Sequence, residues 1–191
     1  MNYLDILVIG NLERAEDGSI LEANSTSTLI RSEQRLVVVD TSSRPSRPAI
    51  KTSFKQLGVF MKDVDTLVLT HPHYDHAENL DMYPNAEVLV HSGGEDNADY
   101  TIVEGNRKLF NGVELVHTPG HTWDSMSVFV KADLNYAIVG DAIPLEDNFR
   151  RNIPPGLNIG ADTAMKSIKT IANFADIIVP GHGAPFKIRK R

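Results

Sequence analysis

The sequence predicts an α/β layered domain, and three features of the 191 residues support this fold class. Short runs of Val, Ile and Leu recur along the whole chain. Two longer segments repeat their apolar residues at helical spacing, and histidines or aspartates follow several of the apolar runs. Because many strands separated by a few helices are typical of layered α/β folds, we expect one such domain over residues 1–191.

Continuous apolar runs predict the strands, because strands covered on both faces lack an alternating pattern. They lie at residues 4–9, 28–31, 36–39, 66–69, 88–90, 113–116, 126–130, 136–139 and 177–179. Apolar residues three or four positions apart predict helices over 49–57 and 161–174, and a shorter helix over 75–80. Residues 144–160 are rich in proline and glycine and predict a long loop.

The composition excludes several classes of protein. The chain has no cysteine, which rules out disulfides, zinc fingers with thiolate ligands and a cysteine nucleophile. The first residues lack the basic region and cleavage site of a signal peptide, and no apolar run approaches the ~18 residues of a membrane span. We therefore expect a cytoplasmic protein with no membrane partner.

A cluster of possible metal ligands directly follows the predicted strand at residues 66–69. It reads His-Pro-His-Tyr-Asp-His and contains His71, His73, Asp75 and His76. In extended backbone, residues two apart point to the same side, so His71 and His73 can face one ion together. Imidazole and carboxylate are the ligands for zinc, iron or manganese where no thiolate is present.

Three further candidates follow other predicted strands in loops that contain glycine. They are His121 in Thr-Pro-Gly-His-Thr, Asp141 in Gly-Asp, and His182 in Pro-Gly-His-Gly. Because functional groups in open α/β sheets gather at the carboxyl ends of strands, we expect these side chains to join the first cluster. Seven candidate ligands would then suffice for two metal ions. The remaining histidines, His91 and His117, lack ligand spacing, and we expect them to be structural.

This set of motifs resembles the metallo-β-lactamase superfamily of hydrolases, and the resemblance runs from Asp40 to Gly183. It implies an αββα sandwich with two divalent ions at one edge. Zinc is the leading candidate for these ions, and manganese or iron are the alternatives. On matching positions it implies one ion on His71, His73 and His121, a second on Asp75, His76 and His182, and Asp141 between them. Asp40 matches an early strand-end aspartate that supports the ligand loops, with a turn cap as its alternative role.

The sequence departs from the family pattern in two places. The family usually has glycines after the last histidine of the first motif, where this chain has Ala77-Glu78-Asn79. It usually has Gly-Ser after the Pro-Gly-His-Thr motif and one further residue, where this chain has Asp124-Ser125. Both departures concern the local backbone and leave the candidate ligands intact.

The ligand set predicts which branch of the family the chain resembles. The missing cysteine and the presence of Asp141 argue against the β-lactamases, and His73 argues against the flavodiiron branch. Nine residues follow His182, which is too few for the helical substrate domain of glyoxalase II-like thioesterases. We expect a hydrolase that uses a hydroxide shared by two metals on a small ester, lactone or thioester. The alternatives are a phosphodiesterase or nuclease of the same fold, a mononuclear iron sulfur dioxygenase, and a protein that binds metal without turnover.

Catalytic and substrate-binding roles follow less directly from the sequence. Asp75 is the candidate to accept a hydrogen bond from the nucleophile and pass a proton on. We expect the Tyr74 side chain to pack against the protein, with contact to the substrate as the alternative. Residues 10–22, 92–99 and 144–160 are candidate substrate loops. Arg150 and Arg151 could receive an anion or merely solvate their loop. The net charge of −6 argues against nucleic acid as a partner, although these arginines and the basic tail 186–191 favour it. We expect that tail to be a frayed terminus.

Overall fold

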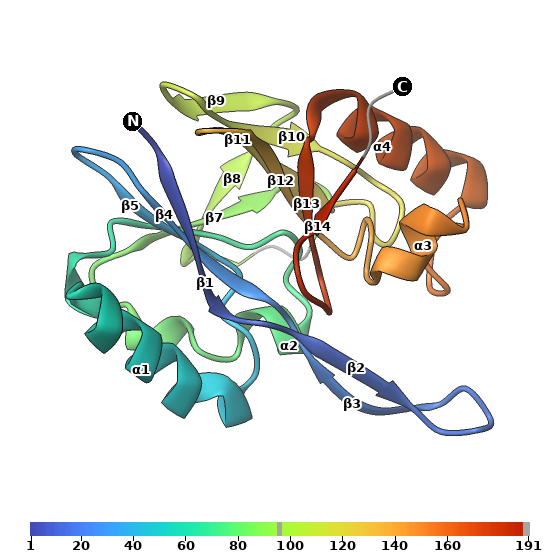
Figure 1. Ribbon diagram of the computed structural model, residues 1–191, viewed down its shortest axis with the longest axis horizontal. Coiled ribbons are helices and arrows are strands. Elements are labelled where there is room, and N and C mark those ends of the chain that lie inside the picture. Colours follow the sequence, from blue (N-terminus) through green and yellow to red (C-terminus); the bar gives the residue numbers. More distant parts are fainter. Residues whose placement is uncertain (95–96, 189–191) are drawn as a thin grey trace.

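The computed structural model describes residues 1–94 and 97–188 and contains two six-stranded sheets that pack face to face (Figure 1). The first sheet has the strand order β1-β4-β5-β6-β7-β8, and the second has the order β14-β13-β12-β11-β10-β9. Helix α1 covers the outer face of the first sheet and α4 covers that of the second. The four layers form the αββα sandwich of the metallo-β-lactamase fold, which confirms the predicted fold class.

The strands of the first sheet are β1 (Tyr3–Val8), β4 (Ser27–Arg31), β5 (Leu36–Val39), β6 (Thr66–Val68), β7 (Glu87–His91) and β8 (Tyr100–Val103). Those of the second are β9 (Arg107–Phe110), β10 (Val113–His117), β11 (Met126–Lys131), β12 (Asn135–Gly140), β13 (Ile177–Pro180) and β14 (Phe186–Lys187). The helices are α1 (Arg47–Leu57), α2 (Tyr74–Ala77), α3 (Glu146–Arg150) and α4 (Ala161–Phe174). Short 3-10 turns cover Arg44–Ser46, Met61–Asp63 and Leu80–Met82.

Three apolar clusters hold the four layers together. The central cluster joins residues of both sheets, among them Val39 and Leu89 from the first sheet and Leu115 and Val128 from the second. A second cluster lies between α4 and the second sheet, and a third lies between α1 and the first sheet. Burial of apolar surface in all three places stabilises the sandwich and fixes the distance between the two sheets.

Strand direction brings several loops to one edge of the sandwich. Strands β5, β6, β7 and β8 pair in parallel, as do β12 and β13. Strand β10 also runs with β12, because both pair antiparallel with β11. The segments that follow β5, β6, β10, β12 and β13 carry Asp40, the first histidine motif, His121, Asp141 and His182. These residues therefore meet where the carboxyl ends of the strands lie.

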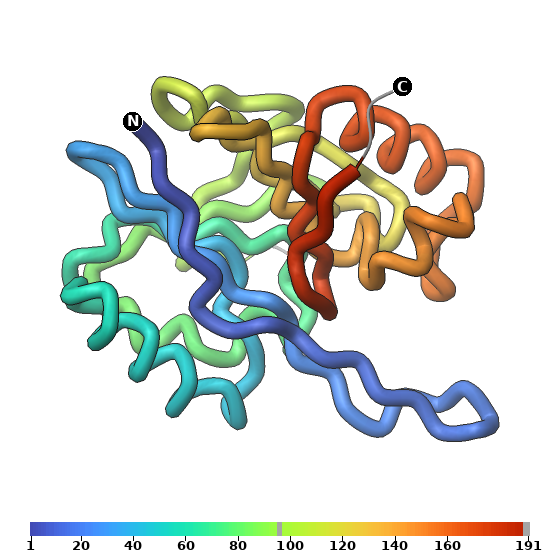
Figure 2. Tube along the Cα trace, in the orientation of Figure 1, coloured from blue at the N-terminus to red at the C-terminus, as the bar shows by residue number. Residues whose placement is uncertain are grey.

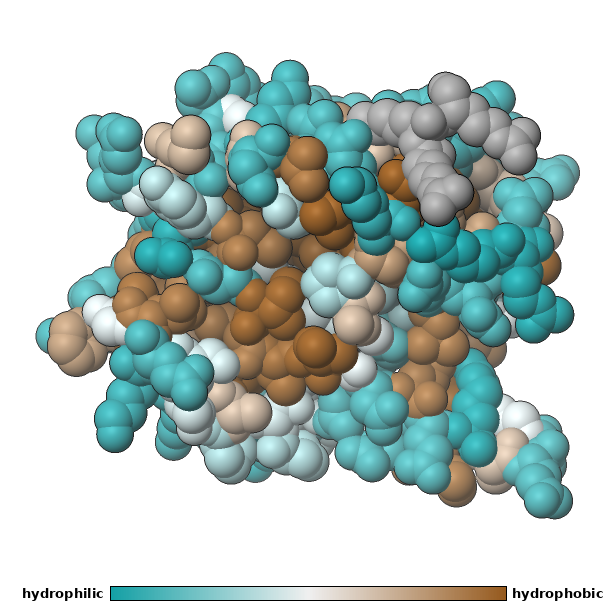
Figure 3. Space-filling view, in the orientation of Figure 1, coloured by the Kyte–Doolittle hydropathy of each residue, from teal (hydrophilic) through white to brown (hydrophobic). Residues whose placement is uncertain are grey.

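A β-hairpin of β2 (Asn11–Arg14) and β3 (Ile20–Asn24) projects from the body of the molecule (Figure 2). Its base is tied to the ligand-bearing loops: Ser25 N–H donates to the Asp75 carbonyl oxygen at 3.1 Å, and Thr26 N–H donates to that of Gly181 at 2.7 Å. A Cβ at Gly10 would collide with backbone atoms of Asn24 and Gly181. Figure 3 shows apolar residues gathered beside β1 and α1, while the visible side of the hairpin is mostly hydrophilic.

Most predicted elements match the structure, and the differences have physical causes. The predicted loop 144–160 contains α3, and the predicted helix 75–80 is wrong in extent because α2 ends at Ala77. The Asn79 backbone leaves the helical region at φ −114° and ψ 23°, and its side chain donates to the carbonyl oxygens of Thr41, Ser42 and Ser43 at 2.7–3.1 Å.

The sequence did not predict five strands, namely β2, β3, β8, β9 and β14. In the described part of the chain, every helix is too short or too polar to span a bilayer. The expected frayed terminus is wrong for residues 186–188, because Phe186 and Lys187 pair with β13 as β14 and Ile188 N–H donates to the Asp176 carbonyl oxygen at 3.0 Å. Residues 189–191 of the basic tail lie outside the described residues, and the single domain over 1–191 stays a prediction.

Candidate metal centre

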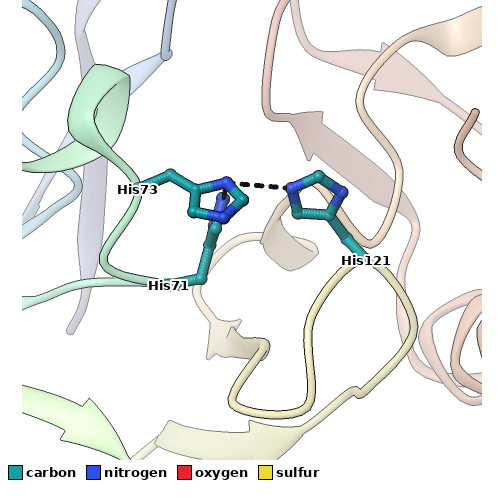
Figure 4. A group of neighbouring side chains, drawn as sticks. All are labelled: His71, His73 and His121. Atoms are coloured by element: carbon teal, nitrogen blue, oxygen red, sulfur yellow. Dashed lines mark hydrogen bonds between the residues drawn. The ribbon is translucent and has the colours of Figure 1, made fainter. Parts of the chain in front are cut away.

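Three histidines from two loops bring one ring nitrogen each to a common point (Figure 4). His71 Nε2 lies 2.9 Å from His73 Nδ1, and His121 Nε2 lies 3.1 Å from the same atom. His71 and His121 are buried, whereas His73 opens to a cavity. The spacing of two residues places His71 and His73 side by side, as the sequence predicts.

A second group of three side chains lies beside the first. Asp75 Oδ2 is 3.4 Å from His182 Nε2 and 3.7 Å from His76 Nε2. His76 is fully buried and His182 is nearly so, while Asp75 is partly exposed. Helix α2 positions Asp75 and His76, because the chain turns into its first helical turn directly after His73.

Asp141 lies between the two groups. Its Oδ1 is 3.2 Å from His182 Nε2 and 3.5 Å from His76 Nε2, and its Oδ2 is 3.7 Å from His121 Nε2. Gly140, in the left-handed region at φ +48°, allows this approach, because a Cβ there would collide with Thr70. One carboxylate thus contacts histidines of both groups.

The outer ring nitrogens of three histidines donate to fixed oxygens. His76 Nδ1 donates to Asp40 Oδ2 at 2.8 Å, His121 Nδ1 donates to the Leu157 carbonyl at 2.9 Å, and His182 Nδ1 donates to the Asn24 carbonyl at 3.0 Å. Such hydrogen bonds fix the tautomer and direct the Nε2 lone pair inward. The arrangement is therefore prepared for a ligand that accepts electron pairs.

Asp40 connects the end of β5 to the first histidine motif. Its carboxylate accepts hydrogen bonds from Thr70 N–H at 2.7 Å and from the Thr70 hydroxyl at 2.8 Å, in addition to that from His76. Its backbone has φ 54°, a left-handed conformation that aspartate and asparagine adopt more readily than most residues. The Asp40 side chain therefore contacts the candidate ligand His76 in addition to Thr70, which is more than a turn cap would do.

The electrostatics divide the histidines into two classes. Burial lowers the pKa of His71 and of His73. Burial also acts to lower the pKa of His76 and of His182, but nearby carboxylates outweigh it and raise both values: Asp40 and Asp141 for His76, and Asp141 for His182. Burial acts to raise the pKa of Asp141, yet the imidazoles of His182 and His76 hold it well below its usual range.

The donor set fits divalent metal ions. Within residues 1–94 and 97–188, His76 Nε2 and Asp141 Oδ1 are buried without a partner at hydrogen-bond geometry, and both point into the centre. A buried polar atom without a partner is costly, and a cation bound there would satisfy both atoms. Neutral imidazoles and carboxylates without thiolates suit zinc, manganese and iron.

At both departures from the family pattern, side chains of this chain hold the local backbone through hydrogen bonds. Asn79 is buried and holds the loop 41–43 through its three side-chain hydrogen bonds. Ser125 Oγ accepts from Thr122 N–H at 3.1 Å and fixes the turn that carries His121. Asp124 is buried against Gly94, where a Cβ would collide with its carboxylate.

Several other residues lie differently from their predicted roles. Tyr74 is 75% exposed, so the expectation that it packs is wrong; it is the first residue of α2 and faces solvent. Arg150 forms an ion pair with Glu146 at 2.8 Å and donates to the Lys187 carbonyl. Neither Arg150 nor Arg151 lines the cavity beside the histidines.

His91 and His117 form a separate pair at the same edge. Their rings stack with centroids 3.8 Å apart and planes 9° apart. His91 Nδ1 donates to the Ser92 carbonyl at 2.7 Å, and His117 Nε2 donates to the Trp123 carbonyl at 2.8 Å. Among the described residues, neither belongs to a group that could hold a metal ion. The stacking and the two hydrogen bonds tie these strand ends together, and a purely structural role for both histidines stays a prediction.

A small cavity of about 100 Å³ opens onto the centre. Its floor contains His73, Asp75, His121, Asp141 and His182. Its walls come from the β2–β3 hairpin, from Pro144 just before α3 and from the segment between α3 and α4; they are formed by Leu12, Arg14, Ile20, Ala23, Pro144, Pro155, Gly156 and Leu157. The sequence indicated residues 10–22 and the proline- and glycine-rich residues 144–160 as candidate substrate loops. It did not show that Leu12, Arg14, Ile20 and Ala23 share one face, because pairing between two strands leaves no pattern within either strand.

The fold and this centre define the class of metal-dependent hydrolases with an αββα sandwich, and comparisons with known proteins agree. A profile described as the Metallo-beta-lactamase superfamily matches residues 21–100. A Methanocaldococcus jannaschii protein named "Probable metallo-hydrolase" is 36% identical over 167 residues, which cover 87% of this chain and 80% of that protein. The Xenopus laevis protein named metallo-beta-lactamase domain-containing protein 1 is 31% identical, over 91% of this chain and 76% of its own.

Solved structures show the same fold at lower sequence identity. A metallo-beta-lactamase-like protein of Thermotoga maritima superposes with a TM-score of 0.79 at 21% identity, over 98% of this chain and 99% of that chain. A quorum-quenching N-acyl homoserine lactone hydrolase superposes with a TM-score of 0.72 at 20% identity, over 89% and 86% of the two chains. The chain belongs to the metallo-beta-lactamase superfamily and is a metallo-hydrolase.

Proposed function

We propose that this metallo-hydrolase binds two divalent ions, with zinc as the leading candidate, and hydrolyses a small ester, lactone or thioester. One ion is assigned to His71, His73 and His121, and the other to Asp75, His76 and His182, with Asp141 shared. The observation that carries the proposal is the position of Asp141, whose two oxygens lie 3.2 Å from His182 and 3.7 Å from His121. A carboxylate placed between two ligand groups is suited to a two-metal site.

The two ions would supply a hydroxide at neutral pH and polarise the substrate carbonyl. Asp75 is the candidate proton carrier, because its carboxylate is partly exposed in the cavity floor. Its Oδ2 faces His76 and His182, which leaves Oδ1 to accept a proton from the attacking group and return it to the leaving oxygen, or to the leaving sulfur of a thioester. Asp40 accepts a hydrogen bond from the outer ring nitrogen of His76 and so fixes the orientation of this candidate ligand.

Two observations support a small carbonyl substrate. The cavity of about 100 Å³ is smaller than the ~300–1,000 Å³ of typical ligand pockets, so it receives a small reacting group and leaves the rest of a substrate at the rim. A relative named N-acyl homoserine lactonase from Bacillus is 25% identical over 61% of this chain and 53% of its own length.

Metal analysis and a substrate panel test the proposal together. The protein is loaded with zinc or manganese, desalted, and its metal content is measured per chain. It is then assayed with an aryl acetate, a lactone, a thioester and a bis-aryl phosphate. We expect about two ions per chain and turnover of a carbonyl substrate that a chelator abolishes. Activity confined to the phosphate diester would replace the proposal with a phosphodiesterase, and a single iron with oxygen uptake on a persulfide would replace it with a dioxygenase.

A further inference from the structure

The β2–β3 hairpin presents one face to the cavity. Leu12 pairs with Ala23, and Arg14 pairs with Ile20 after a bulge that leaves Leu21 of β3 without a partner in the ladder. Side chains two apart on a strand share a face, and directly paired residues on the neighbouring strand share it too. These four residues all line the cavity, whereas the opposed pair Glu13 and Glu22 does not. The hairpin is therefore a two-sided wall whose inner face belongs to the candidate site.

Arg14 is the cation of this inner face. Among the described residues it is the one lysine or arginine that lines the cavity. Its Nη1 donates to the Gly18 carbonyl at 2.9 Å, which anchors the guanidinium across the hairpin tip. No carboxylate of the described residues lies within ion-pair distance of it. A guanidinium has five N–H donors, so most of them remain available to a ligand.

Apolar side chains surround the approach to Arg14. Ile20 on the hairpin is 46% exposed, and Leu157 on the facing segment is 59% exposed, although both line the cavity. Leu12 and Pro155 continue these two apolar walls. Exposed apolar side chains at the mouth of a polar centre are typical of a surface that a ligand covers.

We propose that Arg14 receives a carboxylate of the substrate, so that the enzyme prefers an ester or lactone that carries this group beyond a short apolar segment. The reacting carbonyl lies at the floor, the apolar segment lies between Ile20 and Leu157, and the carboxylate pairs with the guanidinium. An arginine fork matches the geometry of a carboxylate and adds binding energy through charged hydrogen bonds. This assignment rests on the proposed function for its reaction and on the hairpin register for its specificity.

A matched pair of esters tests the preference. The zinc-loaded enzyme is assayed with mono-4-nitrophenyl adipate, which has a free carboxylate, and with its methyl-capped counterpart. We expect kcat/KM to be about 10-fold higher for the free acid. Arg14→Met removes this preference through KM, and Arg14→Lys keeps part of it; an unchanged free-acid preference in Arg14→Met overturns the proposal. Arg151→Met is the control, because it removes the same charge from an exposed residue outside the cavity.

A binding experiment keeps the two proposals distinguishable. Calorimetry compares adipate with hexanoate, which share one carboxylate for the metal centre and differ in the second one. We expect adipate to bind about 10-fold more tightly to the wild type and equally to Arg14→Met. An unchanged adipate preference in Arg14→Met, or an equal loss for both ligands, overturns the role of Arg14. Absence of ester turnover together with an Arg14-dependent adipate preference would instead overturn the proposed reaction.

Discussion

The two groups of histidines at one edge of the sandwich differ in what their second ring nitrogen contacts. In the candidate ligand cluster, outer nitrogens donate to Asp40, Leu157 and Asn24, while inner nitrogens point toward one another and toward Asp141. In the stacked pair, His91 and His117 also donate to carbonyl oxygens, but their rings lie flat against each other. Both groups lie at strand ends and both contain buried histidines, so neither feature by itself indicates a metal ligand.

Convergence of lone pairs, and not the presence of histidine, therefore marks the site. The ligand cluster contains carboxylates within 3.2–3.7 Å of its imidazoles. The stacked pair joins the end of β7 in one sheet to the end of β10 in the other. The first group is arranged to hold cations, and the second holds the loop of Trp123 in place.

The largest effect is expected from Asp141→Asn, which keeps the size of the side chain and removes its charge. Because Asp141 contacts both ligand groups, metal content falls below two ions per chain, and kcat/KM falls by more than the ~10–100-fold typical of losing an outer partner. Metal analysis and circular dichroism check the result. Retention of both ions and of activity would erase the distinction between the two groups.

Asp40→Asn tests how strongly an outer partner supports the ligand cluster. Asparagine tolerates the left-handed backbone at this position, so the fold is retained. We expect metal affinity to fall about 10–100-fold, because His76 loses its charged acceptor. Competition with a chelating dye measures this affinity. A change below twofold would assign Asp40 to a turn cap.

His117→Phe tests the stacked pair. Phenylalanine keeps an aromatic ring against His91 but cannot donate to the Trp123 carbonyl. We expect the free energy of unfolding to fall by about 1 kcal/mol, with both metal ions retained. Urea denaturation and metal analysis measure the two quantities on the same sample. Loss of metal would show that the pair belongs to the site.

The smallest effect is the pH dependence contributed by His91. Burial lowers the pKa of His91 below its usual ~6.5, so the folded state binds the proton less readily than the unfolded state. Its contribution to stability is complete above pH ~6.5 and decreases as pH falls through that value toward the folded pKa. The free energy of unfolding is measured in the presence of a chelator for the wild type and for His91→Gln. We expect the difference between the two proteins to become smaller as the pH is lowered. A constant difference between pH 5 and 8 would contradict the assignment.

How far the fold could be predicted depends on burial. The central strands β5, β6 and β12 are continuous apolar runs, because both of their faces are covered. The missed strands β2, β3 and β9 are largely exposed, so their sequences contain charged residues and lack a strand pattern. Helix α4 has the predicted bounds of 161–174, since one apolar stripe contacts the second sheet.

The candidate site, like the fold, could be predicted from the sequence only in part. The seven candidate ligands could be found because each lies in a short motif after an apolar run, and the structure brings all seven together; their binding of metal stays a prediction. The wall formed by Leu12, Arg14 and Ile20 could not be found, because its inner face is set by the register and bulge of a hairpin. Periodicity within one strand does not report which face meets a distant loop.

The base and the tip of the β2–β3 hairpin are open to different kinds of evolutionary change. At the base, Gly10, Asn24 and Thr26 are held against the loops of Asp75 and His182 by backbone contacts. At the tip, residues 15–19 contact one another and lie at the surface. Insertions and exchanges at the tip can therefore alter which molecules are accepted while the chemistry is preserved, so paralogues of this chain are expected to diverge there first.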